Sequence, residues 1–363
     1  MHQDARSALG TGVTTARLGA IMPSLLSQTL GISAKSSSWG WMDKLAQEKR
    51  IEERLDAERA GLNDDTKAVV RALGVLMPSI ESVDDVLITR AVNAATEDYP
   101  SKPPEYRAEK AGKEIEKILA WRAAQEVDSI LERDLDNTEE FHRCWPVTTH
   151  GSDEFGHPII CERIVDIDAK GLEGPGFAKG LAMMHRVQIM EALDHVKRRT
   201  AVAKGHRLHK HVWVIDLHGI TTSHLTGSVR TFLYDLISLC QDKYTDTLHA
   251  MWLVNAPYVF RAMWSAIKTM VRKSTKDKIQ ILGESDSSGI QEAMRLYSVS
   301  PESMPTCVPG GKHEGVRAWE IVLQARHERR LVREKGGKDS STVTSEVDAD
   351  FDDFDDSSRG KDN

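Results

Sequence analysis

Three closely spaced histidines, His206, His209 and His211, are the side chains whose type and spacing come nearest to a metal site. Imidazole is a common ligand of zinc and other transition metals. Lysine and arginine side chains alternate with these histidines, however, and their positive charges would repel a bound cation. We therefore interpret the segment as a basic loop in contact with solvent, and we expect no metal and no other cofactor.

The chain lacks the short motifs that most directly identify an enzyme. It contains no GxSxG nucleophile turn, no GxxxxGK[ST] phosphate loop and no HExxH metal helix. Its four cysteines are far apart and form no CxxC pair, which argues against a zinc site or a disulfide scaffold and fits a reducing compartment. Catalytic groups can also converge from distant positions, so the missing motifs do not exclude catalysis. We nevertheless expect a protein that is not an enzyme.

The net charge of −7 is concentrated in one segment. Seven acidic residues and no basic one lie between Glu346 and Asp356, so the charges of the remaining chain sum to zero. Nucleic-acid-binding domains are basic on balance, and we therefore expect no nucleic-acid partner. No run of about 18 apolar residues is present, which predicts that no helix crosses a membrane. The acidic segment is expected to be a disordered, solvated tail, with contact to a protein partner as the alternative.

A stripe of large apolar side chains follows Pro257, with basic residues on the other faces of the same predicted helix. Its members recur at helical spacing: Phe260, Met263, Trp264, Ile267 and Val271. Such a stripe is most often the side of a helix that faces the core. It also fits a mobile lid over a lipid cavity, with cations able to meet anionic headgroups. The pattern alone leaves both interpretations open.

The elements that must position these side chains divide the chain into five segments. We expect a weakly ordered N-terminus over 1–40, a helical region over 41–140, a domain of alternating strands and helices over 141–311, one further helix over 312–340, and the acidic tail over 341–363. Short apolar runs at 158–161, 212–215, 251–254 and 278–283 predict buried strands. Helices between strands imply crossover connections, and the expected fold is therefore α/β, with a mixed, largely parallel sheet.

Several motifs occur in a fixed order within the third segment. An Asp-x-x-Gly turn opens the first strand at Asp153, another closes a strand at Asp216, and Asn-x-Pro at Asn255 closes the next. The aromatic helix, a Thr-x-x-Lys-Ile segment at Thr275 and a Pro- and Gly-containing segment over 304–311 follow. Residues 145–311 thereby resemble the CRAL-TRIO family, which includes phosphatidylinositol/phosphatidylcholine transfer proteins. The resemblance implies an apolar lipid pocket floored by the sheet, with the aromatic helix (Phe260, Met263, Trp264 and Ile267) as a gate helix.

The same resemblance implies a site for the headgroup of phosphatidylinositol. Its residues correspond to Asp153, Asp246, Thr275 and Lys278, with Asp246 standing where the family has a longer glutamate. A family arginine corresponds to Arg90, in a helix that departs from the usual pattern. Lysine suits a phosphate as a compact charge, and threonine donates one hydrogen bond. An exposed strand-end lysine and an exposed turn carboxylate remain the alternatives for Lys278 and Asp246.

A second headgroup site, for phosphatidylcholine, is less complete. Its two hydroxyls correspond to Thr221 and Ser223, but Ile160 and Thr149 stand where the family has tyrosines. Without these aromatic faces, a choline ammonium loses cation–π contacts worth about 0.5–2 kcal/mol. The resemblance therefore favours phosphatidylinositol over phosphatidylcholine.

The function implied by the resemblance is that of a cytoplasmic carrier of one phospholipid. Such a carrier would contact anionic membrane surfaces transiently while it exchanges its lipid. Two alternatives remain: a lipid-sensing regulator that presents a phosphoinositide to a kinase or scaffold, and a carrier of another small hydrophobic ligand.

Overall fold

The computed structural model describes residues 44–174, 177, 180–221, 228–284 and 286–336. Ser223, the N-terminus expected at 1–40 and the acidic tail expected at 341–363 lie outside the described residues. Within the part that is described, no helix is long and apolar enough to cross a membrane.

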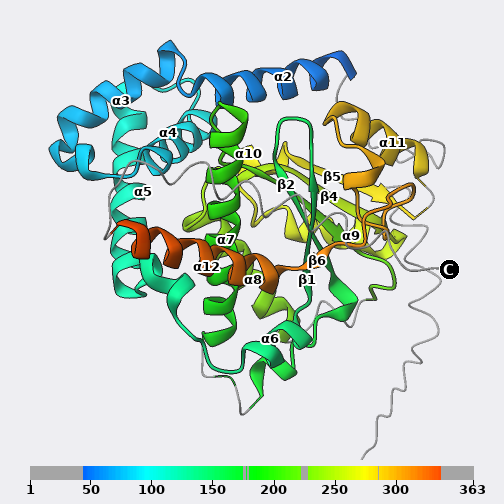
Figure 1. The fold of residues 1–363 in the computed structure, drawn as a ribbon. Coiled ribbons are helices and arrows are strands. Elements are labelled where there is room, and N and C mark those ends of the chain that lie inside the picture. Colours follow the sequence, from blue (N-terminus) through cyan, green and yellow to red (C-terminus); the bar gives the residue numbers. More distant parts are fainter. Residues whose placement is uncertain (1–43, 175–176, 178–179, 222–227, 285, 337–363) are drawn as a thin grey trace, which may run out of the picture. The chain divides into compact units, whose positions relative to one another are not determined.

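The fold is built on a six-stranded sheet with the strand order β5-β4-β3-β2-β1-β6 (Figure 1). The strands are β1 Val147–Ser152, β2 Pro158–Arg163, β3 His211–Asp216, β4 Leu248–Ala256, β5 Ile279–Gly283 and β6 Val316–Arg317. Strands β2, β3, β4 and β5 are mutually parallel, whereas β1 pairs antiparallel with β2 and β6. The predicted α/β fold with a mixed, largely parallel sheet is confirmed.

Helices precede, separate and follow the strands. Those before the sheet are α2 Lys44–Ala60, α3 Asp64–Leu76, α4 Asp85–Asp98, α5 Pro104–Ala124 and α6 Thr138–Cys144. The others are α7 Leu181–Lys204, α8 Ser228–Asp242, α9 Tyr258–Ile267, α10 Lys273–Lys276, α11 Ser287–Leu296 and α12 Ala318–Gly336. Side-chain caps fix the starts of α3 and α4: the Asn63 side chain accepts a hydrogen bond from the amide of Thr66 at 2.8 Å, and the Asp84 side chain accepts one from the amide of Leu87 at 3.0 Å.

One face of the sheet packs against α6, α7, α8 and α12. Alternate strand residues such as Ile160 and Trp213 point to this face and meet Val187 and Leu193 of α7. Figure 1 shows α12 crossing α7, and the two helices are in contact. The same face continues toward β5, where Leu253 packs with the residues of α9.

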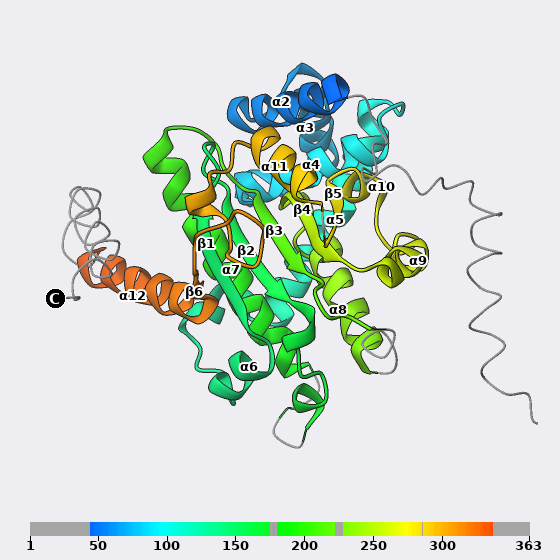
Figure 2. The ribbon, with the colours of Figure 1, turned by 90° about the vertical axis from the view of Figure 1, so that its right-hand side faces the viewer.

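The opposite face packs against α2 and α11. Val212, Val214 and Trp252 lie on this face with Ile51 of α2 and Ile290 of α11. Figure 2 shows α2 and α11 on the same side of the strands, and α9 and α10 near the β5 edge. The sheet is therefore covered on both faces, as a parallel sheet requires.

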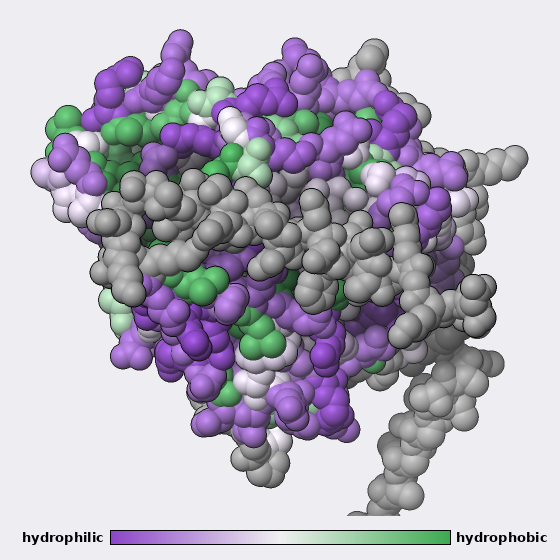
Figure 3. Space-filling model, in the orientation of Figure 1, coloured by the Kyte–Doolittle hydropathy of each residue, from purple (hydrophilic) through white to green (hydrophobic). Residues whose placement is uncertain are grey.

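Helices α3, α4 and α5 form a separate apolar cluster, which includes Leu73, Val92 and Ile115. The surface in Figure 3 is largely hydrophilic, with hydrophobic side chains gathered over the α3 region. Val75 and Leu76, at the end of α3, are the exposed apolar residues there, at 80% and 57% relative exposure.

The motifs at the carboxyl ends of the strands bond to one another. The carboxylate of Asp216 accepts hydrogen bonds from the Asn255 side chain at 2.8 Å and from the His218 amide at 2.9 Å. Asn255 also donates to the carbonyl of Cys307 at 3.1 Å. It adopts a left-handed conformation (φ 51°), which asparagine tolerates better than most residues. These motif residues therefore hold β3, β4 and the 304–311 segment together.

Candidate functional site

The candidate site lies where the four parallel strands begin. His157 directly precedes β2, Lys210 directly precedes β3, Asp246 lies two residues before β4, and Lys278 directly precedes β5. Because these strands are parallel, their first residues meet at one edge of the sheet. Each strand thus contributes a polar side chain to the same edge.

Lys278 and Asp246 form the centre of this row. The Lys278 ammonium lies 3.1 Å from Asp246 Oδ1 and 3.2 Å from Glu97 Oε2. Both side chains are buried, at 4% and 1% exposure. The alternative interpretation, that these two side chains are exposed to solvent, is therefore wrong. His209 Nε2 lies 3.2 Å from Asp246 Oδ2, and Lys210 lies 3.5 Å from Oδ1. Burial alone would raise the pKa of Asp246, but Lys210, Lys278 and His209 hold it well below its usual range.

A strained backbone and a buried arginine position Asp246. The residue has a φ of 50°, in the left-handed region that aspartate visits more readily than most residues. Arg90 of α4 donates to the carbonyls of Thr245 at 2.8 Å and Lys243 at 3.3 Å. These two bonds fix the loop that carries Asp246. Arg90 is not among the residues that line the cavity described in the next paragraph.

A small cavity of about 70 Å³ lies beside this pair and has a mixed lining. Its charged and hydroxyl-bearing lining residues include Glu97, Asp246, Arg272, Ser274, Thr275 and Lys278, and His211, Gln241, Tyr244, Thr245 and Thr247 add further polar groups. Its apolar lining comes from Met190 of α7, Trp213, Leu248 and Met251 of the sheet, and Cys240 of α8. A volume of that size holds only a few water molecules, so the described conformation is too small for a phospholipid.

The cations and hydroxyls of this lining suit an anionic group. Lys278 supplies an ammonium and Thr275, which is partly exposed, a hydroxyl. Arg272 also lines the cavity and pairs with Glu114 at 3.1 Å and Asp242 at 3.5 Å. Glu97 is the more exposed of the two carboxylates on Lys278, at 30% of its side chain. An incoming phosphate would therefore displace Glu97 more readily than Asp246.

Asp153 and Thr221 are not part of this cavity. Asp153 Oδ1 accepts the amides of Gly156 and His157, both at 2.8 Å, and Oδ2 lies 2.7 Å from Nδ1 of His157. It is linked to Asp246 only indirectly, through His157, Glu58 and His209. Thr221 is exposed.

The expectation of a solvated basic loop at residues 206–211 is wrong for its second half. His209, Lys210 and His211 are 3%, 4% and 1% exposed. The reason is that Glu58 of α2 packs onto this segment and neutralises it. Its Oε1 accepts the amides of His209 at 2.7 Å and Lys210 at 3.1 Å. Burial would raise the pKa of Glu58, but His209, His157 and Lys210 keep it well below its usual range.

The gate helix corresponds to α9, and it packs against the sheet. Phe260 is buried at 4% exposure and meets Leu217, Ile220 and Leu253, while Trp264 and Ile267 are partly buried in the same cluster. Met263 belongs to α9, but its side chain lies outside what the structure describes. The apolar stripe predicts a helix that reaches Val271, whereas α9 ends at Ile267 and a turn follows. That part of the prediction is wrong, because apolar spacing continues by chance across the turn.

Comparison with known proteins gives one matching family model. Residues 142–302 match the model described as the CRAL/TRIO domain. This range nearly coincides with the resemblance found at 145–311 and confirms it.

Curated relatives match over a similar stretch. Phosphatidylinositol/phosphatidylcholine transfer proteins SFH7 and SFH9 of Arabidopsis thaliana are 29% and 26% identical over 189 and 222 residues, covering 51% and 59% of this chain. "Protein real-time" of Anopheles gambiae is 24% identical over 262 residues, 68% of this chain. The matches cover 34%, 37% and 37% of these relatives, so the chain spans about a third of their length. A solved structure, "Crystal structure of Sfh5", aligns with a TM-score of 0.47 at 17% identity, over 67% of this chain and 81% of that one.

Proposed function

Because the chain carries a CRAL/TRIO domain at residues 142–302, we propose that it binds one phospholipid molecule, with phosphatidylinositol preferred, and transfers it between membranes. The relatives SFH7 and SFH9 are named as transfer proteins for phosphatidylinositol and phosphatidylcholine, which supports this class of ligand.

The observation that carries the proposal is the cavity with its mixed lining. Lys278 and Thr275 offer a cation and a hydroxyl donor. Met190, Trp213 and Met251 offer apolar contacts. An amphiphile with an anionic head matches this lining, because each buried CH₂ contributes about 0.8 kcal/mol and each hydrogen bond to a charged group about 1.5–3 kcal/mol.

The charges of the lining support phosphatidylinositol over phosphatidylcholine. A choline ammonium gains most from a carboxylate that is not already paired with another cation. Asp246 at this site is already paired with Lys278, Lys210 and His209. Thr221, proposed for the phosphatidylcholine headgroup, lies outside the cavity. We therefore assign the headgroup phosphate to Lys278 and Thr275, with Asp246 holding the lysine in place.

Lipid entry is proposed to move α8, which lines the cavity, and the neighbouring α9 away from the sheet. A cavity of about 70 Å³ is far below the ≈ 300–1,000 Å³ typical of small-molecule sites. Cys240 of α8 lines the cavity. Trp264 of α9 is only partly buried, in the apolar cluster that contains Leu253 and Phe260. A membrane surface can stabilise the open form by accepting the apolar side of α9. We therefore propose that α9 is the gate.

An open groove next to the cavity is a candidate for membrane contact. Its volume is about 580 Å³, and Arg272 lines both it and the cavity. Lys110, Lys113 and Lys117 of α5 and Lys243 also line it. Its cations outnumber its acidic residues, Asp98, Glu114 and Asp242, and this favours an anionic surface.

The proposal is tested by lipid extraction and transfer. Protein purified from a eukaryotic host is extracted and its lipids are identified by mass spectrometry; we expect about one phospholipid per chain, enriched in phosphatidylinositol. Transfer of labelled phosphatidylinositol between vesicles should exceed transfer of labelled phosphatidylcholine. The absence of any co-purifying phospholipid, together with no transfer of either lipid, would refute the proposal.

A further inference from the structure

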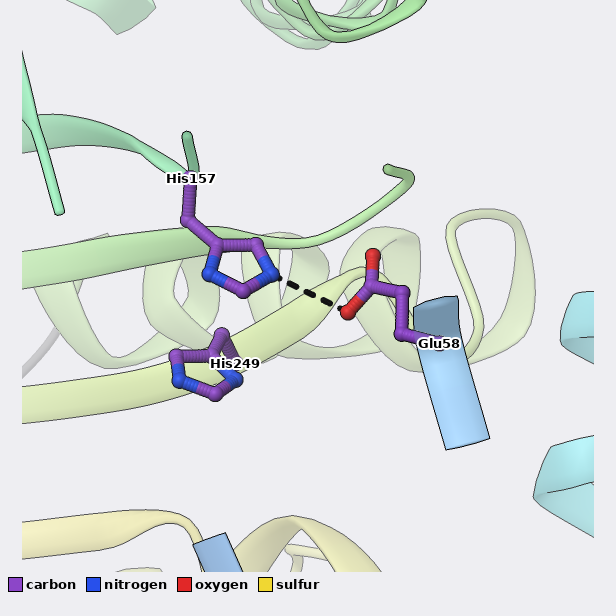
Figure 4. A group of neighbouring side chains, drawn as sticks. All are labelled: Glu58, His157 and His249. Carbon is purple, nitrogen blue, oxygen red and sulfur yellow. Dashed lines mark hydrogen bonds and ion pairs between the residues drawn. The ribbon is translucent and has the colours of Figure 1, made fainter. Parts of the chain in front are cut away.

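A group of buried side chains of metal-ligating types lies near the candidate site, on the face of the sheet that α2 covers. Glu58 comes from α2, His157 from the residue before β2, and His249 from β4 (Figure 4). One candidate ligand atom from each residue lies within 4.8 Å of the other two. The three residues are 1%, 0% and 1% exposed.

His249 is the member of this group whose buried ring nitrogens have no hydrogen-bond partner among the described residues. A buried polar group without a partner is costly, so native structures rarely retain one without another ligand. The His249 ring stacks on His157 with centroids 4.1 Å apart and meets Tyr297 edge-on. These contacts hold the ring in the cluster without using its nitrogens.

The other two members are oriented as metal ligands usually are. His157 uses Nδ1 for Asp153, at 2.7 Å, which leaves Nε2 directed at Glu58. Glu58 uses Oε1 for the amides of His209 and Lys210, which leaves Oε2 directed at His157, 3.0 Å away. A carboxylate behind a ligating histidine and amides behind a ligating carboxylate are the outer contacts that fix such ligands.

We propose that Glu58, His157 and His249 form a zinc site, with Nε2 of His157, one ring nitrogen of His249 and Oε2 of Glu58 as ligands. Two imidazoles and one carboxylate are an established zinc-binding set. Zinc–ligand distances of about 2.0–2.2 Å require the three atoms to approach more closely than 4.8 Å. To reach the metal, the His249 ring must turn out of its stack on His157, a movement that no hydrogen bond to its nitrogens opposes.

Carboxylates and cations both border the cluster. Glu58 and Asp153 are buried carboxylates beside it. Lys210 and Arg54 are cations that act on His249, so a bound dication would depend on the two carboxylates and on loss of the proton from His157. On binding, zinc replaces the proton that His157 Nε2 shares with Glu58, and that proton is released to solvent.

The site is tested by metal binding to the full chain, a readout independent of lipid transfer. Protein stripped with a chelator and dialysed is titrated with ZnCl₂ by calorimetry, and bound zinc is counted by mass spectrometry. We expect one zinc per chain with micromolar or tighter affinity. Co²⁺ in its place should give the visible absorption of a tetrahedral site.

Substitutions separate ligation from folding. His249→Phe keeps a stacked ring and removes both unpaired nitrogens, so it should fold and lose at least a hundredfold in zinc affinity. His211→Phe is the matched control, because His211 is equally buried at 1% and both its nitrogens are unpaired among the described residues. It should keep full affinity. Asp153→Asn should lower zinc affinity about 10–100-fold. If wild-type protein binds no stoichiometric zinc, or His249→Phe binds it as tightly as wild type, the site is refuted.

Discussion

Lys278 and Lys210 are two buried lysines that share one carboxylate, Asp246. They differ in one respect that matters for ligand binding: Lys278 lines the cavity and Lys210 does not. Sequence spacing alone gives no way to tell their roles apart, and only the resemblance singled out Lys278. The structure makes them a matched pair for experiment.

Substituting each lysine by methionine should separate stability from binding. Both variants lose one partner of Asp246, which keeps its remaining partners, so each should lose about 1–3 kcal/mol in the free energy of unfolding. Lys278→Met should in addition lower phosphatidylinositol affinity ten- to a hundredfold, since a charge-assisted contact contributes about 1.5–3 kcal/mol. Urea denaturation and transfer of labelled phosphatidylinositol measure the two effects. Equal transfer by the two variants would remove Lys278 from the headgroup site.

Residues of the candidate site were predictable only where a motif marked them. Thr275 and Lys278 precede a recognisable strand, and Asp246 stands at a fixed distance from Asn255. Glu58 could not be found in this way, because it is one of many charged residues in α2 and its partners come from distant segments. Arg272 also lines the cavity, and none of the motifs marks it.

At the scale of elements, apolar runs predicted β2, β3, β4 and β5, since strands buried on both faces need continuous apolar sequence. The boundary of α9 was not predictable, because a turn interrupts the helix without interrupting its spacing. Whether α9 belongs to the core or acts as a lid depends on the free energy of its packing against the sheet, which residue spacing does not reveal.

Trp264→Ala should distinguish these two roles of α9. Trp264 is partly buried, so the variant should lose less stability than the about 3–5 kcal/mol of a core tryptophan, yet exchange lipid more slowly. Trp252→Ala is the control, because Trp252 is fully buried on the opposite face. Melting temperatures and vesicle-to-vesicle transfer rates give the comparison. If Trp264→Ala melts as low as Trp252→Ala, α9 is a fixed part of the core.

Basic residues of the groove should govern binding to anionic vesicles. Lys113 and Lys117 on α5 are exposed, and their double substitution by glutamate should weaken binding severalfold, with the wild-type affinity falling as salt rises. Lys49→Glu with Lys67→Glu makes the same charge change elsewhere and serves as the control. Vesicle sedimentation measures both. Equal loss in the two double variants would point to net charge and not to the groove.

For the chain as a whole, acid should destabilise the fold through half-buried histidines that the fold keeps neutral. Burial lowers the pKa of His142 and His150 to about 4, with His185 and His313 adding to the effect. A folded pKa below the unfolded value of about 6.5 gives stability that is present above pH 6.5 and is lost as the pH falls toward 4.

Urea unfolding at pH 7 and pH 5 measures that loss. His150→Phe removes one of the titrating groups, so the free energy of unfolding should fall less between the two pH values than in wild type. An identical fall in both proteins would show that His150 does not contribute.

The docking of Glu58 onto the segment before β3 makes the two amides there reporters of helix α2. The N–H groups of His209 and Lys210 are protected by a side chain from another element and not by a strand partner. Their exchange with deuterium therefore requires only that α2 lift away, whereas the central strand amides require the sheet to open. A lipid or metal ion that fastens α2 should slow exchange at these two positions selectively, and each ligand can be detected there without a functional assay.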